Sequence, residues 1–102
     1  MSSSVLAEAL ISADLFGEGD CERIFVDAID ALQGQSRHLD SRDRVNLICG
    51  ITYGLRKRLR QRPVEGVWIT RLAKRIWAIS KESGLDKHWD PSMIRWVEEL
   101  GP

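Results

Sequence analysis

The longest patterned stretch of the chain is residues 41–61, SRDRVNLICGITYGLRKRLRQ. Its apolar side chains recur every three or four residues, which is the period of an α-helix. They cover more than half of the helix circumference, so we expect this helix to lie at the centre of a bundle. Asp40 or Ser41 can cap its free amides, and it should end before Pro63, since proline disfavours a helical residue before it. The stripe consists of Val45, Ile48, Cys49, Ile51, Thr52, Leu55 and Leu59.

The sequence on both sides of this stretch repeats the helical period. The spacing predicts further helices over residues 4–16, 20–33, 66–83 and 91–100. No alternating strand pattern, internal repeat or low-complexity tract competes with this interpretation. We therefore predict an all-α fold, a compact bundle of about five helices that forms a single domain over residues 1–102.

Several residues between the predicted helices have the chemistry of caps. Asp20 is a candidate N-cap, Gly17 can supply a left-handed stop, and Gly84 ends the fourth predicted helix. Asp90 followed by Pro91 fits the start of the last helix, because a proline in the first turn loses no hydrogen bond. In this interpretation Trp68, Trp89 and Trp96 occupy core or staple positions and are buried.

Composition places the chain among ordinary globular proteins. It has 102 residues, 43% of them apolar and 29% charged, and its formal net charge is zero. Apolar runs are too short to span a membrane, and the N-terminal residues do not resemble a signal peptide. Cys21 and Cys49 show no metal-binding spacing, which favours a reducing, cytoplasmic location and two buried, inert thiols. We expect no cofactor and no metal.

The charge is unevenly distributed along the sequence. Residues 56–81 hold nine bases and one acid, whereas the flanking segments are acidic. If the third and fourth helices form a hairpin across Pro63, these bases could join into one positive surface with Trp77 at its edge. The candidate partner-binding residues are Arg58, Arg60, Arg62, Arg71, Lys74, Arg75, Trp77 and Lys81.

Three interpretations of this basic region remain open. It fits an acidic surface on a protein partner, and it fits the phosphates of DNA or RNA through counterion release. It is also explained without any ligand, because cations near a helix C-terminus offset the macrodipole and exposed charges are solvated. Trp77 either anchors a partner as a half-exposed side chain or packs beneath a neighbouring helix.

The motif Gly50-Ile51-Thr52-Tyr53-Gly54 places two glycines on one side of the central helix. Each glycine costs about 1 kcal/mol relative to alanine inside a helix, so something should compensate for it. The close approach of another helix would do so. Our first interpretation is a helix of the same chain, and the second is a homodimer seam.

No residue pattern specifies a reaction. His38 and His88 lie in polar joints, and neither shows a spacing typical of a nucleophile or of a zinc site with Cys21 or Cys49. We assign no catalytic residue. The sequence favours a non-enzymatic regulatory or adaptor protein that binds another protein through a basic helical face, with nucleic-acid binding through residues 56–81 as the alternative.

Overall fold

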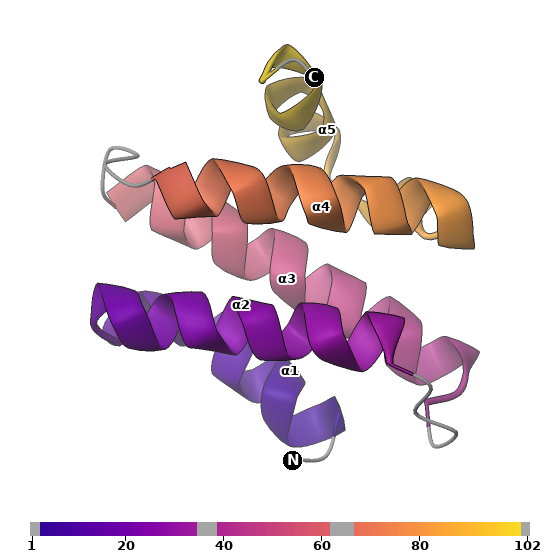
Figure 1. The fold of residues 1–102 in the computed structure, drawn as a ribbon, viewed down its shortest axis with the longest axis horizontal. Coiled ribbons are helices and arrows are strands. Elements are labelled where there is room, and N and C mark those ends of the chain that lie inside the picture. The colour runs from indigo at the N-terminus through magenta and orange to yellow at the C-terminus, as the bar shows by residue number, and fades with distance from the viewer. Residues whose placement is uncertain (1–2, 35–38, 62–66, 101–102) are drawn as a thin grey trace.

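The computed structural model describes residues 3–34, 39–61 and 67–100, and these residues form helices joined by short connections (Figure 1). The expected all-α bundle of five α-helices is confirmed. His38, Arg62 and Pro63 lie outside the described residues. The elements in chain order are α1 (Ser3–Ile11), the 3-10 turn η1 (Ala13–Leu15), α2 (Glu18–Gln33), α3 (Ser41–Gln61), α4 (Val67–Ser83), the 3-10 turn η2 (Asp86–His88) and α5 (Pro91–Glu99).

Helix α3 lies at the centre of the bundle, as its wide apolar stripe predicts. It packs against α1, α2 and α4 and also touches both 3-10 turns. Figure 1 shows α2 and α4 side by side in front of α3, while α1 and α5 lie at opposite ends of the view. The buried residues of α3 are Leu47, Ile48, Gly50, Ile51, Thr52, Gly54, Leu55 and Arg58.

The glycines of α3 mark its contact with α1. A methyl group on Gly54 would lie 2.6 Å from the backbone oxygen of Leu10 and 3.1 Å from the ring of Phe25. On Gly50 it would meet Leu10 at 3.4 Å. At Gly54 only a residue without a side chain lets the backbone of α1 come this close, whereas a methyl group at Gly50 would make an ordinary van der Waals contact with α1. The intrachain interpretation of the two glycines is therefore confirmed.

Caps at three joints agree with the sequence. Asp40 accepts a hydrogen bond from the Asp43 amide (2.8 Å) at the start of α3. Asp90 accepts one from the Ser92 amide (2.8 Å), with Pro91 opening α5. Gly84 has a φ of 71° and ends α4 in the left-handed region, where an L side chain would be strained.

The joint between α1 and α2 differs from the prediction. The Ser12 hydroxyl donates to the Glu8 carbonyl (2.8 Å), and α1 ends at Ile11 instead of continuing to Phe16. The short η1 turn follows, and Phe16 is left exposed. Gly17 has a φ of −61° and serves as the N-cap of α2, so the predictions of a left-handed Gly17 and an Asp20 cap are wrong. Local side-chain bonding to the backbone competes with helix extension here.

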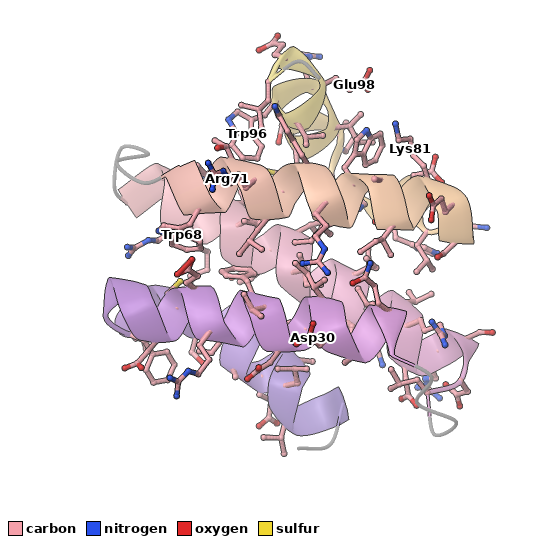
Figure 2. The ribbon with its side chains drawn as sticks, viewed as in Figure 1. Asp30, Trp68, Arg71, Lys81, Trp96 and Glu98 are labelled. Atoms are coloured by element: carbon pink, nitrogen blue, oxygen red, sulfur yellow. The ribbon has the colours of Figure 1, made fainter. Side chains whose placement is uncertain are left out.

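The tryptophans join the outer helices to the core. Trp89 is buried, and its indole Nε1 donates to Ser80 Oγ (2.9 Å), which in turn donates to the Ile76 carbonyl (2.7 Å). Trp68 lies between α2 and α4 in Figure 2, and its ring centre is 6.4 Å from that of Phe25. Trp68 and Trp96 are only partly buried, although both pack against the core.

Candidate docking surface on helix α4

The solvent-facing side of α4 carries a row of cations. Its inner side is fixed by the buried Ile69, Leu72 and Ile76, which recur at helical spacing. The residues on the other side are therefore exposed or half-buried. Figure 2 shows Arg71 and Lys81 towards the two ends of this helix. They lie ten residues apart in sequence, which corresponds to about 15 Å along a helix that rises 1.5 Å per residue. We define the α4 basic face as Arg71, Lys74, Arg75 and Lys81.

Local contacts orient two of these cations without neutralising them. Arg75 Nη2 donates to the neutral side chain of Gln33 on α2 at 2.7 Å. Lys81 Nζ lies 5.5 Å from the ring centre of Trp77, a cation–π distance. Both side chains remain exposed, as does Arg71. The positive charges of Arg71, Arg75 and Lys81 are therefore presented to the solvent.

Trp77 supports the α4 basic face from one side. Its ring packs edge-on against Trp89, with the centres 4.9 Å apart and the planes at 66°. Trp77 is half-buried and packed against the core cluster. Its ring lies under Lys81 Nζ, and its packing agrees with the second interpretation, whereas contact with a partner stays a prediction.

The bases of α3 do not join this face. Arg56 forms an ion pair with Asp90 (3.0 Å), and Lys57 Nζ donates to the Ile11 carbonyl at the end of α1 (3.2 Å). Arg58 is only 5% exposed. Arg60 is exposed, but it follows Tyr53 by seven residues and shares the outer ridge of α3. Because α3 is the central helix, successive bases on it point to different neighbours.

This arrangement corrects the expectation of one positive surface over residues 56–81. Buried Arg58 is not available at the surface, and Arg60 lies on another helix face. Arg62 is outside the described residues. The part of the predicted set that the structure brings together lies on α4, with Trp77 beside it.

Acidic residues lie next to the α4 basic face. Helix α2 packs against α4, and its exposed ridge includes Asp27 and Asp30. In Figure 2, Asp30 on α2 and Arg71 on α4 lie on the same side of the molecule. The surface is therefore mixed in charge, with a negative helix beside a positive one.

The expectation that Cys49 is buried is wrong, whereas that for Cys21 is confirmed. Both thiols are free, but Cys49 is exposed. Helix α1 contacts α3 at Gly50 and Gly54, and Cys49 is turned about 100° away from Gly50. The apolar pattern gave Cys49 the character of a core residue, but the helices of the described residues leave it exposed.

A small hollow of about 240 Å³ lies beside His88. Its lining includes Cys49 and the ion pair of Arg56 with Asp90. Two hydrogen bonds from Ser92 lower the pKa of Asp90 from its usual value of 3.8, and Arg56 adds to this effect. Within residues 3–34, 39–61 and 67–100, no three His, Cys, Asp or Glu side chains are grouped to hold a metal ion.

A larger hollow of about 660 Å³ lies between α1 and α3. No sequence pattern indicates this hollow, although Gly50 and Tyr53 belong to the motif of residues 50–54. The glycines indicate that another helix approaches α3. The two glycines do not indicate that α1 leaves the neighbouring side of α3, at Asn46, Cys49 and Tyr53, uncovered.

Comparison with known proteins adds no relative. No protein-family model matches the chain, and no curated protein or solved structure gives a significant match. Among the helices of the described part of the chain, none has the length and apolar character needed to cross a bilayer.

Proposed function

We propose that the chain is a non-enzymatic regulatory or adaptor protein, and that the α4 basic face docks onto an acidic surface of another protein. The observation that carries the proposal is the layout of α4. One side of this helix is packed in the core, and the other presents the exposed cations Arg71, Arg75 and Lys81 on a rigid scaffold, with half-buried Lys74 beside them. Fixed charges on a rigid face speed encounter with a partner of opposite charge and select its orientation.

The acidic ridge of α2 favours a protein partner over a nucleic acid. A phosphate backbone crossing from α4 onto α2 would meet Asp27 and Asp30, which repel it. A protein surface can place acids opposite α4 and bases opposite α2. Its match to the mixed face would therefore be better than that of a uniformly negative polymer.

The proposed location is a reducing compartment such as the cytoplasm. Both cysteines are free, and Cys49 is exposed. An exposed thiol keeps its reduced form most readily where glutathione and thioredoxin act.

The test is affinity capture from nuclease-treated lysate of the native host. The variant Arg71→Glu, Lys74→Glu, Arg75→Glu reverses the centre of the α4 basic face. The control Arg23→Glu, Arg42→Glu, Lys87→Glu makes the same charge change at exposed positions on other elements. We expect the control to retain the partner and the α4 variant to lose it. Equal capture by both variants would contradict the proposal.

A gel-shift assay with mixed DNA and RNA at low salt examines the alternative. Binding to phosphates weakens steeply as salt is added, because each neutralised phosphate releases counterions. We expect no retardation at micromolar protein. Retardation that the α4 variant abolishes would replace the protein partner with a nucleic acid.

A further inference from the structure

The α1/α3 groove, the hollow of about 660 Å³ between α1 and α3, is a second surface, separate from the α4 basic face. The described residues that line it belong to α1 and α3. Ala7 and Ile11 contribute from α1, while Gly50 and Tyr53 contribute from α3. The lining residues on α3 extend from Asp43 to Tyr53, a length of about 15 Å or nearly three helical turns.

Two exposed large apolar side chains, Ile11 and Tyr53, line the groove. Among the described residues, every large apolar side chain that is exposed belongs to α1, η1, α3 or the residue after η1. Exposed apolar surface of this kind marks an interaction site more often than single scattered side chains do. These side chains are Val5, Ile11, Leu15, Phe16 and Tyr53, with 44–79% of their surface exposed.

The charges around the groove differ at its two ends. Among the described lining residues, the charged ones are Glu8 and Asp43, and both are acidic. Beyond Tyr53, Lys57 Nζ lies 5.5 Å from the tyrosine ring centre and donates to the Ile11 carbonyl. A helix in the groove would be stabilised with its N-terminus near Asp43 and its C-terminus near Lys57, because the helix dipole is positive at its start.

We propose that the α1/α3 groove binds an amphipathic helix of another protein, whose apolar face enters the groove and whose flanking lysines or arginines face Glu8 and Asp43. The length of the groove, its apolar walls and its acidic lining together fit this mode of recognition. The exposed apolar side chains that line the hollow, Ile11 and Tyr53, come one from α1 and one from α3, and the length of nearly three helical turns favours a helix over a small molecule.

A second copy of the chain fits the groove less well. The α4 basic face has no exposed large apolar side chain to insert. Two copies meeting groove to groove with their α3 helices parallel would bring Glu8 and Asp43 against the same acids of the other copy. Like charges in close opposition oppose association. With the helices antiparallel, Asp43 would instead face Lys57, whose Nζ already donates to the Ile11 carbonyl.

The test uses the thiol of Cys49, which lines the groove and is exposed, whereas Cys21 is buried. The probe is an amphipathic leucine–lysine peptide of about 14 residues, long enough to fill the groove at 1.5 Å per residue. We expect it to slow the alkylation of Cys49 by N-ethylmaleimide several-fold. A peptide of the same composition, scrambled so that no apolar face forms, and a leucine–glutamate analogue should leave the rate unchanged.

Matched charge variants test whether the leucine–lysine peptide binds at the α1/α3 groove. Glu8→Lys should weaken binding of the leucine–lysine peptide about fivefold, as expected for reversing one surface charge contact. Asp27→Lys makes the same charge change on α2 and should leave the affinity unchanged. Both variants keep Cys49, so the alkylation rate can be measured in each.

Three outcomes would overturn the proposal. The first is peptide binding that leaves Cys49 as reactive as before, since the peptide would then lie elsewhere, for example on the acids of α2. The second is equal protection by the scrambled or the glutamate peptide. The third is protection of Cys49 that rises with protein concentration in the absence of peptide, which would indicate a second copy. None of these outcomes bears on the α4 basic face.

Discussion

Helices α3 and α4 both carry many bases, but they use them differently. On α3, Arg56 pairs with Asp90, Lys57 donates to the end of α1, and Arg58 is buried. On α4, Arg71 and Lys81 are exposed at the surface. The long side chains of a helix that is packed on several sides contact its neighbours. Those of a helix that is packed on one side are exposed to the solvent or to a partner. Position in the bundle, and not composition, decides what a base can do.

The largest effect on stability is expected at the glycine contact of α3. Gly54→Ala puts a methyl group 2.6 Å from the Leu10 carbonyl oxygen, so α1 must move. We expect a loss of about 2–3 kcal/mol in unfolding free energy, the upper range for overpacking, since the contact is with backbone. Urea unfolding followed by circular dichroism measures it.

Gly19→Ala in α2 is the matched control. Nothing lies within 4 Å of a methyl group at Gly19. Alanine is the better helix former, so this change should be neutral or stabilising by up to about 1 kcal/mol. Equal stabilities of the Gly54 and Gly19 variants would refute the close contact between α1 and α3.

The next largest expected effect is on unfolding free energy, and it differs between a base of α3 and a base of α4. Arg58→Ala removes a side chain that is only 5% exposed, and should cost about 1–3 kcal/mol through lost packing and unpaired polar neighbours. Arg71→Ala removes an exposed side chain and should stay within about 0.5 kcal/mol of wild type. Thermal and urea unfolding of both variants would check this. A loss of unfolding free energy for Arg71→Ala as large as that for Arg58→Ala would contradict the proposed difference between the bases of α3 and α4.

The smallest expected effect is a dependence of folding stability on pH that arises from the carboxyl group of Asp90. Hydrogen bonds from Ser92, together with Arg56, lower its pKa in the folded chain. A lowered folded pKa means that the stabilisation is present above the unfolded pKa and is lost as the pH falls through the folded pKa. Asp90→Asn keeps a good N-cap but removes the charge.

The difference in melting temperature between wild type and Asp90→Asn is the measurable quantity. We expect wild type to be the more stable at pH 7 and the difference to shrink as the pH falls below 3.8, the usual pKa of the carboxyl group. A difference that stays constant down to strongly acidic pH would argue against a role for the charge.

Helix periodicity, caps and glycines were sufficient to predict most of the fold. The central position of α3, the contact at Gly50 and Gly54 and the caps at Asp90 and Gly84 follow from residue chemistry that acts locally or on one helix face. The break after Ile11 was not predictable in the same way, because the Ser12 hydroxyl competes with continued helix by a small energy difference.

The surfaces were less predictable than the helices. Cys49 lies on an apolar stripe, and a helical wheel cannot indicate which part of a wide stripe the neighbours cover. Arg58 belongs to a basic run, yet its direction depends on how the neighbouring helices pack around α3. On α4 the prediction was simpler, because a narrow apolar stripe leaves a clear opposite side.

Lysine footprinting of the captured complex tests the role of the α4 basic face most directly. The chain has four lysines, and Lys74 and Lys81 belong to that face, whereas Lys87 is exposed on η2. Acetylation followed by mass spectrometry compares the protein alone with the partner-bound form. We predict that the partner protects Lys74 and Lys81 and leaves Lys87 reactive. Protection of Lys87 with continued reaction at Lys74 and Lys81 would contradict the account.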